Sequence, residues 1–423
     1  MNLNIESKRI ELQKDIAAHV RYCHRENICD RIIKICGISG TGKTQLALCF
    51  AQNTKCSMYF SFRGLDHRTA LVQFKRTFSA WSDLSPAMTW QEAFQLLVPF
   101  FKKHYTRIVL DDLEHSKSES EVIAAIERLS ESLTDMKNLF LLTCRCESSF
   151  GKHELFRVSL YTSSDIKKHA QKMSAVDVAR MCAVTGGLSA LLNDYDETRS
   201  FSDNLYNWIS TESLLYRLMP QMLSEQFRTP ESYHAILYAI ATGKHRLSEI
   251  AKHMAVPNNQ CKKYLDALIA MGLIEVREHC YTILNSYVDF WHRFFYLNVG
   301  RLVTAPSDAA SEILSQLDEF TLEKQIPECI KKLPFDIPKD AKRQYNAVFD
   351  FAFQSGSHTV LIKLPESLDW HCTKQELDRL FDSVMDYCSA FYEAEICVVS
   401  FNRFSNYCVK QAGQLDNLHL VVG

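Results

Sequence analysis

The sequence predicts an α/β fold in which a doubly wound parallel sheet comes first and smaller parts, largely helical, follow. Across residues 31–160, short β-branched and aromatic runs alternate with longer segments of helical periodicity. That alternation is typical of a parallel sheet with helices on both faces. At 423 residues the chain is too long for one hydrophobic core, so about two to four domains are expected.

Residues 37–44 carry the most specific motif. They match the complete phosphate-loop pattern G-x-x-x-x-G-K-[ST], between a predicted strand at 31–36 and a predicted helix at 45–53. The residues expected to contact a nucleotide are Gly37, Ile38, Ser39, Gly40, Thr41, Gly42, Lys43 and Thr44. Backbone N–H groups and the helix N-terminus would bind phosphate, Lys43 would reach the β and γ phosphates, and the Thr44 hydroxyl would bind Mg²⁺. We therefore predict a P-loop nucleoside triphosphatase; the alternative is a loop that keeps its shape without binding nucleotide.

A pair of acids ends a later predicted strand. After a strand at 57–62 and helices at 69–81 and 89–105, residues 107–112 read Arg-Ile-Val-Leu-Asp-Asp, the pattern of a Walker B strand. Strand ends in parallel sheets meet at the ligand-binding edge, so we expect Asp111 to hold Mg²⁺ through water. Asp112 or Glu114 could orient or deprotonate the attacking water. For Glu114 the alternative is an exposed acid at a helix start.

The next predicted strand, 138–143, ends near two further candidates. Thr143 or Arg145 could sense the γ-phosphate at the same edge. The alternative for Arg145 is a surface charge paired with a carboxylate. A last strand is predicted at 156–160, and short helices follow, broken where Gly186 and the next glycine mark a helix end.

Residues 229–284 predict a winged helix-turn-helix. Helices are expected at 232–242, 247–254 and 260–271, followed by a hairpin that ends near residue 283. A DNA-reading third helix would present Lys262 and Lys263. Acidic residues nearly balance the basic ones here, which favours a domain used for protein packing over DNA binding.

The rest of the chain returns to α/β character after an aromatic cluster and a helical segment. We interpret His292, inside the aromatic cluster, as structural. The terminal part is expected to contain the strands 348–353, 359–364, 395–401 and 418–422 and the helices 373–390 and 405–414. A metal-dependent nuclease of this topology would place an acid near Asp350 and a Glu-x-Lys on the next strand, where this chain has Leu361-Ile362-Lys363.

Composition limits the possible partners. A net charge of -2 provides no global field for nucleic-acid binding. The fifteen cysteines include no C-x-x-C pair, which argues against a zinc ribbon or disulfide scaffold and favours a reducing cytoplasm. No apolar run reaches the ~18 residues of a membrane span, and the first residues lack the apolar region of a signal peptide. We therefore expect a cytoplasmic protein without a membrane partner.

Taken together, these segments resemble the archaeal-type AAA-like ATPases of the STAND group of P-loop NTPases. Besides the phosphate loop, the resemblance depends on LDDLEH (110–115), TGGLSALL (185–192), SYHAILYAIATGKHRLSEIA (232–251), KKYLDALIAMGLIE (262–275) and FWHRFFYLN (290–298). It implies ATP binding, slow hydrolysis and a nucleotide-driven switch between compact and open arrangements. In that picture Gly37, Gly42, Lys43 and Thr44 hold phosphates, Asp111 serves Mg²⁺ and Asp112 serves hydrolysis.

The chain also departs from this family. Its usual Gly-x-Pro is Gly187-Leu188-Ser189, and its N-terminal Gly-Arg-Glu element is degraded near residues 7–9. The glutamate of the related nucleases is Leu361, which offers no oxygen to a metal ion, so we predict no nuclease activity.

The expected domains are a P-loop ATPase core (1–160), a helical lid (161–228), a winged helix with an aromatic helix (229–300), a helical linker (301–345) and a degenerate nuclease-like α/β domain (346–423). The leading hypothesis is an ATP-driven switch that uses Lys43, Asp112 and Arg145 in catalysis. It would act on a protein partner or through self-assembly. The alternatives are a DNA-associated regulator acting through the winged helix and an ATP-regulated nuclease.

Overall fold

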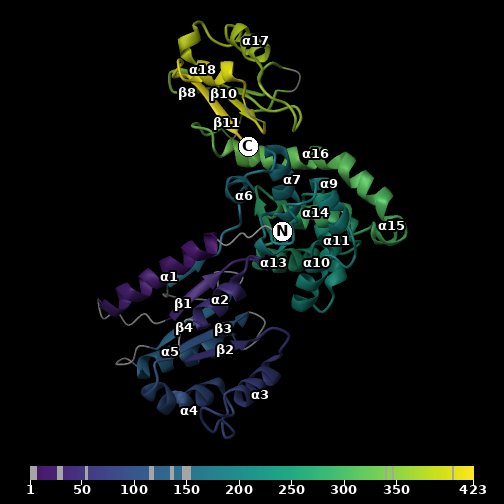
Figure 1. Ribbon diagram of the computed structural model, residues 1–423. Coiled ribbons are helices and arrows are strands. Elements are labelled where there is room, and N and C mark those ends of the chain that lie inside the picture. The colour runs from purple at the N-terminus through teal and green to yellow at the C-terminus, as the bar shows by residue number, and fades with distance from the viewer. Residues whose placement is uncertain are drawn as a thin grey trace.

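The computed structural model describes residues 7–25, 32–52, 56–113, 119–133, 138–144, 154–338, 341–344, 347–402 and 404–423. Figure 1 shows three bodies that follow one another along the chain. We call them the sheet body (residues 7–157), the helical body (158–338) and the C-terminal body (341–423). Among the described residues, no helix has the length and apolar character that crossing a membrane requires.

A parallel sheet of five strands, in the order β2-β3-β4-β1-β5, forms the centre of the sheet body. The strands are β1 (Ile32–Cys36), β2 (Ser57–Ser61), β3 (Arg107–Asp111), β4 (Leu139–Cys144) and β5 (Glu154–Arg157). Every residue of β1 and β4 is buried, as expected for strands covered on both faces. The sheet therefore agrees with the predicted α/β fold.

Helices cover both faces of this sheet. They are α1 (Ser7–Arg25), α2 (Lys43–Gln52), α3 (His67–Thr77), α4 (Trp90–Lys103) and α5 (Glu119–Ser132). One hydrophobic cluster joins the sheet to α3, α4 and α5, and a second joins it to α1 and α2. A capping box starts α4, because the Thr89 hydroxyl accepts a hydrogen bond from the Glu92 N–H at 3.2 Å.

Two details of the sheet body differ from the sequence prediction. Strand β5 lies at Glu154–Arg157 instead of 156–160. Beyond Arg157 only Val158 still bonds to β1, through a hydrogen bond of 2.8 Å from its N–H to the Cys36 carbonyl. Beyond it the chain leaves the sheet for the helical body. Helix α5 was not predicted, although its buried positions Val122, Ala125, Ile126 and Leu129 have helical spacing.

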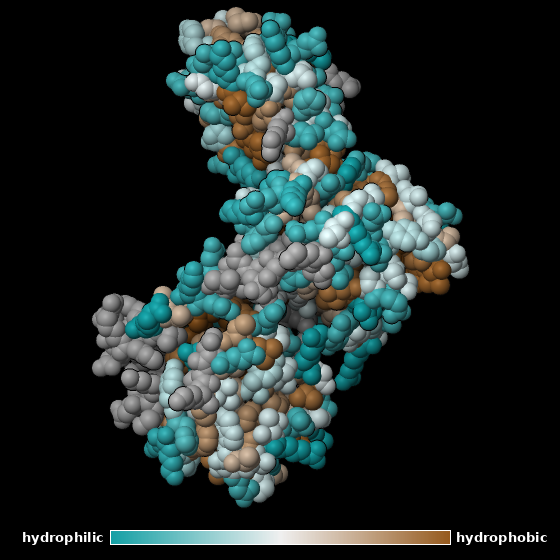
Figure 2. Space-filling model, viewed as in Figure 1, coloured by the Kyte–Doolittle hydropathy of each residue, from teal (hydrophilic) through white to brown (hydrophobic). Residues whose placement is uncertain are grey.

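The helical body is one packed unit, since a single hydrophobic cluster extends from Tyr161 to Phe320. Its elements are α6 (Ser163–His169), α7 (Ala175–Thr185), α8 (Ser189–Leu192), α9 (Phe201–Trp208), α10 (Leu214–Gln226), α11 (Pro230–Ala241), α12 (Leu247–His253), α13 (Asn258–Ala270), β6 (Ile274–Arg277), β7 (Cys280–Ile283), α14 (Ser286–Phe294), α15 (Val299–Thr304) and α16 (Pro306–Ile330). Figure 2 shows hydrophobic residues at its surface near α15, where Leu297 and Val303 are 65% and 63% exposed.

The predicted glycine break ends helix α7 and joins it to two other segments. Gly186 caps the helix with a left-handed φ of 60°, and Gly187 follows with 70°. An added Cβ would lie 2.0 Å from Asn285 Oδ1 at Gly186 and 2.2 Å from the Tyr161 carbonyl oxygen at Gly187. Only glycine fits at this joint.

Two buried histidines, His234 of α11 and His292 of α14, pair within the aromatic cluster of α14. His292 Nδ1 donates to the Val288 carbonyl at 2.7 Å, so its Nε2 accepts a hydrogen bond from His234 Nδ1 at 3.1 Å. Burial lowers the pKa of His292 to about 3 and that of His234 to about 4. Both rings therefore remain neutral parts of the interior, in agreement with the structural interpretation of His292.

The C-terminal body is a sheet in the order β11-β10-β9-β8 with two helices. Its elements are β8 (Phe351–Ser355), β9 (His358–Lys363), α17 (Lys374–Val384), β10 (Ala394–Ser400), α18 (Asn406–Ala412) and β11 (Leu418–Val422). Helix α17 ends at Val384, before the predicted residue 390, because a turn follows it at residues 385–387. Val176 of α7 and Cys329 of α16 share a hydrophobic cluster with Val360 of β9, so this body packs directly on the helical body.

Candidate nucleotide-binding site

The predicted phosphate loop connects β1 to α2 and has the backbone of an anion cradle. Gly40 and Gly42 have φ angles of 85° and 92°, a region that disfavours residues with a Cβ. A Cβ at Gly37 would lie 2.9 Å from Thr41 Oγ1. Helix α2 starts at Lys43, so its N-terminal N–H groups follow directly from the loop. The glycines are therefore required by the loop conformation itself.

The Lys43 side chain lies against this loop. Its ammonium donates to the carbonyl oxygens of Gly37 at 2.6 Å and Ile38 at 3.2 Å, and only 5% of the residue is exposed. The Thr41 hydroxyl donates to the same Ile38 carbonyl at 2.8 Å. The half-buried Thr44 follows in the first turn of α2. The cation is thus held inside the cradle, where it can neutralise a phosphate.

Two neighbours hold the carboxylate of Asp111, which is 1% exposed at the end of β3. Thr143 of β4 donates to Oδ1 at 2.5 Å, and the Tyr59 hydroxyl of β2 donates to Oδ2 at 2.8 Å. Burial and the Asp111 charge raise the pKa of Tyr59, so its phenol keeps the proton that it donates. Each carboxylate oxygen therefore has a fixed donor.

The same threonine also positions Asp112. The backbone N–H of Asp112 donates to Thr143 Oγ1 at 2.8 Å, and Asp112 has a φ of 54°, which is unusual for a residue other than glycine. One hydroxyl thus accepts from Asp112 and donates to Asp111. Residues held in such an uncommon backbone conformation occur often at functional sites.

The structure gathers most of the predicted residues at one edge of the sheet. Strand β4 lies between β1 and β3, and its Thr143 is paired with Ile35, just before the loop. Lys43, Thr44, Asp111 and Asp112 all belong to this edge. The predicted Arg145 and Glu114 lie outside the described residues.

Contacts from the helical body reach the loop. The Gly40 carbonyl accepts hydrogen bonds from the Ala190 N–H at 3.1 Å and the Ser189 hydroxyl at 3.3 Å. An ideal Cβ on Gly272 would be 3.9 Å from Ile38 Cγ2. Ser189 belongs to the predicted Gly187-Leu188-Ser189 turn, but its contact with Gly40 was not predicted, because the two residues lie 149 positions apart. The helical body therefore packs directly against the phosphate loop.

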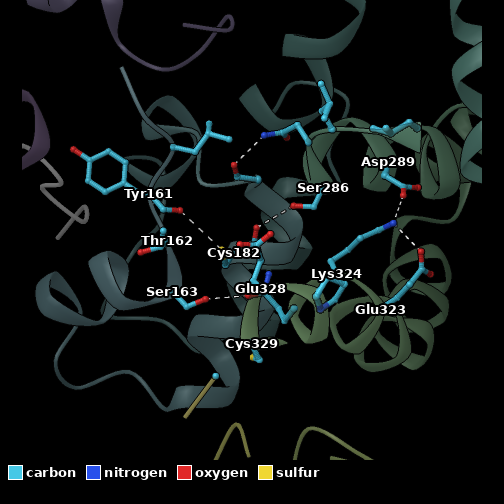
Figure 3. Close-up of a pocket in the computed structure, with 18 of the residues that line it drawn as sticks. Tyr161, Thr162, Ser163, Cys182, Ser286, Asp289, Glu323, Lys324, Glu328 and Cys329 are labelled. Atoms are coloured by element: carbon cyan, nitrogen blue, oxygen red, sulfur yellow. Dashed lines mark hydrogen bonds and ion pairs between the residues drawn. The ribbon is translucent and has the colours of Figure 1, made fainter. Parts of the chain in front are cut away.

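A separate cavity of about 410 Å³ lies between residues 160–163, α7, α14 and α16. Figure 3 shows Lys324 between two acids at its wall, Asp289 and Glu323, and the Glu323 contact measures 2.7 Å. On the other side Ser286 donates to the Cys182 carbonyl at 3.3 Å. No residue of the phosphate loop lines this cavity, so it is distinct from the nucleotide site.

Comparison with known proteins supports the fold. No family model matches the chain. Among curated sequences, an uncharacterized protein of Methanocaldococcus jannaschii is 23% identical over 343 residues, covering 73% of this chain and 75% of that protein. Among solved structures, a Walker-type ATPase of Pyrococcus abyssi has a TM-score of 0.50 and 15% identity, covering 67% of this chain and 95% of that one. The match with Cdc6p of Pyrobaculum aerophilum covers 73% of this chain and 95% of that one, with a TM-score of 0.36 and 14% identity.

The fold is that of a P-loop nucleoside triphosphatase. The parallel sheet, its phosphate loop and the likeness to the Pyrococcus abyssi structure agree on this point. The residues present fit a nucleoside triphosphate with Mg²⁺, because a cation, a helix N-terminus, a hydroxyl and a buried carboxylate meet at one edge. A bound Mg²⁺ would neutralise charge on the transferred phosphoryl group.

In the C-terminal body, Asp350, the acid expected for a metal-dependent nuclease, is held by two cations and a backbone N–H. Asp350 Oδ1 accepts from Arg343 Nη2 at 2.8 Å, and Oδ2 accepts from the Leu364 N–H at 2.8 Å. Lys363 Nζ lies 3.8 Å from Oδ2, and Leu361 is buried. Within the described ranges, no group of three or more His, Cys, Asp or Glu residues could hold a metal ion.

Proposed function

We propose that the protein is a slowly hydrolysing ATP switch whose nucleotide state sets the position of the helical body on the sheet body. The observation that carries this proposal is the pair of hydrogen bonds from Ser189 and Ala190 to the Gly40 carbonyl. A loop that rearranges around a triphosphate must change these bonds. The switch therefore needs no separate relay between nucleotide and helical body.

The residues of the site divide the work as follows. The loop and Lys43 bind the phosphates, Thr44 and Asp111 serve Mg²⁺, and Asp112 orients the attacking water. Thr143 is a positioning residue, since it acts through both acids. Arg145 follows β4 and is proposed as a γ-phosphate contact. Slow turnover suits a switch, because the bound triphosphate must last long enough to be sensed.

The helical body would provide the lid and the winged helix of such a switch. Helices α11, α12 and α13 with the β6-β7 hairpin have the expected order of a winged helix. Packing is favoured as its role, because Gly272, directly after α13, lies beside the phosphate loop. Duplex DNA binding that weakens on replacement of Lys262 and Lys263 would support the DNA-associated regulator instead.

A protein partner or a second copy of the chain would complete the switch. The exposed hydrophobic residues near α15, Leu297 and Val303, belong to the helical body, which is the part proposed to move. A nucleotide-dependent surface of this kind could recruit a partner in one state only.

Nucleotide binding by calorimetry tests the proposal. Lys43→Ala should abolish ATP binding, because it removes the cation of the cradle, while Asp112→Ala should keep ATP bound and stop its hydrolysis. Lys103→Ala, an exposed charge at the end of α4, is the matched control and should bind as the wild type. Unchanged ATP affinity in Lys43→Ala would refute the site.

A further inference from the structure

Arg63 occupies a fixed position beside the acids of the site. It follows β2, and the N–H of the preceding Phe62 donates to the Asp111 carbonyl at 2.9 Å. The Phe62 side chain is fully buried, with its ring 5.5 Å from that of Trp90. Gly64 then turns the chain with a φ of 73°. The backbone of Arg63 is therefore anchored at the edge where Asp111 and Asp112 lie.

The Arg63 side chain crosses to the helical body. Its Nε and Nη2 donate to the same oxygen, Glu225 Oε1, at 3.0 and 2.8 Å. Gln221 donates to that oxygen as well, at 2.8 Å. Arg63 is about half exposed, with 48% of its side chain accessible to solvent. The Glu225 side chain is more buried, with 17% accessible, but the exposed guanidinium leaves the pair partly screened by solvent. Its net contribution to stability is therefore small, and a phosphate can compete for the cation.

Two contacts of α10 face the sheet body from one side of the helix. Leu218 Cδ2 would lie 3.3 Å from a Cβ on Gly40 of the phosphate loop, and Glu225 binds Arg63. Residues seven apart share a helix face, so α10 spans from the phosphate loop to the end of β2. A movement of α10 would therefore alter both ends of the nucleotide site.

Three carboxylates stabilise the positive charge of Arg63: those of Glu225, Asp112 and Asp111. Partial burial opposes that charge, but the hydrogen bond and ion pair with Glu225 outweigh burial and raise the pKa of Arg63. Asp112 and Asp111 also favour the cation. Its guanidinium thus lies within electrostatic range of the carboxylates that would serve hydrolysis.

We propose that Arg63 senses the γ-phosphate by exchanging Glu225 for a phosphate oxygen, which releases α10 when ATP but not ADP is bound. This inference rests on the proposed ATP site. A phosphate offers the guanidinium more charge than a carboxylate, together with oxygens spaced for its planar fork. Glu225 is then the competing anion that holds the helical body in place while no γ-phosphate is present.

Calorimetry with ADP and with the non-hydrolysable analogue AMP-PNP tests the exchange. Arg63→Gln should weaken AMP-PNP binding about tenfold, the effect of losing a charge-assisted hydrogen bond, and leave ADP binding unchanged. Glu225→Gln should tighten AMP-PNP binding several-fold, because the competitor is weakened. Arg68→Gln, an exposed arginine in the first turn of α3, is the matched control and should change neither.

Amide hydrogen exchange provides a second readout. AMP-PNP should speed exchange in α10 of the wild type relative to ADP, and this difference should disappear in Arg63→Gln. If Arg63→Gln changes ADP and AMP-PNP affinity equally, or neither, while the wild type binds both, Arg63 is only a tether and the inference fails. If the wild type binds neither nucleotide, the proposed function itself fails.

Discussion

Acidification should destabilise the helical body through its buried histidine pair. In the folded protein the pKa values of His234 and His292 are about 4 and about 3, against an ordinary value of 6.5. Below pH 6.5 the unfolded chain therefore binds more protons than the folded one, and stability falls with pH. The contribution is complete above pH 6.5, is lost as the pH falls towards 4 and 3, and does not change further below that range.

The size of the effect at pH 5 depends little on the folded pKa values, because both lie below 5. At pH 5 each unfolded histidine lies about 1.5 units below its pKa and is protonated. At 1.36 kcal/mol per unit, this stabilises the unfolded state by about 2 kcal/mol per histidine. The pair together should lower the free energy of unfolding by about 4 kcal/mol between pH 8 and pH 5. That is a large part of the stability of an ordinary domain.

Urea denaturation at pH 8, 7, 6 and 5, followed by tryptophan fluorescence, measures this loss. Trp291 is a suitable reporter, since its ring lies 5.0 Å from that of His234. His234→Phe should halve the pH-dependent loss, to about 2 kcal/mol, whatever it does to stability at pH 8. The exposed His371→Phe is the control and should leave the loss unchanged. Equal pH dependence in the wild type and His234→Phe would refute the reasoning.

Two further predictions concern the site and the glycine joint. Thr143→Val should slow ATP hydrolysis and lower the unfolding free energy by about 2–4 kcal/mol, because a charged oxygen of Asp111 and a buried N–H lose their partner. Thr106→Val is the control, because it removes a hydroxyl bonded only to neutral groups. In urea denaturation it should cost about 1 kcal/mol. Equal losses of unfolding free energy in the two variants would contradict the assignment. Gly187→Ala should lower stability by about 2 kcal/mol or more, since its Cβ would meet the Tyr161 carbonyl. In thermal denaturation Gly243→Ala, with a φ of 92° but no atom within 4 Å, should cost only about 1 kcal/mol, and a similar loss at both positions would contradict the steric explanation.

The local parts of the site could be predicted from the sequence. The glycines, Lys43 and Thr44 form one contiguous motif, and the strand before Asp111 is apolar throughout. Their chemistry depends on neighbours along the chain. The alternation of strands and helices likewise predicted the parallel sheet.

The partners of these residues could not be predicted, because tertiary pairing brings them in. Tyr59 reaches Asp111 across 52 positions through the pairing of β2 with β3, and Arg63 meets Glu225 across 162 positions. No local pattern marks either contact. Helix α5 differs, since its apolar spacing was present in the sequence and could have identified it.

The position of β4 between β1 and β3 makes strand register a determinant of the geometry of the site. In the sheet order the loop-bearing strand β1 and the acid-bearing strand β3 are not neighbours, so the backbone hydrogen bonds that set their relative position run through β4. A slip of one residue in β4 would turn the Thr143 hydroxyl to the opposite face and separate it from both acids. Buried residues such as Phe140 and Leu142, which lock this register, are therefore as necessary to the geometry of the site as the residues that would touch the nucleotide.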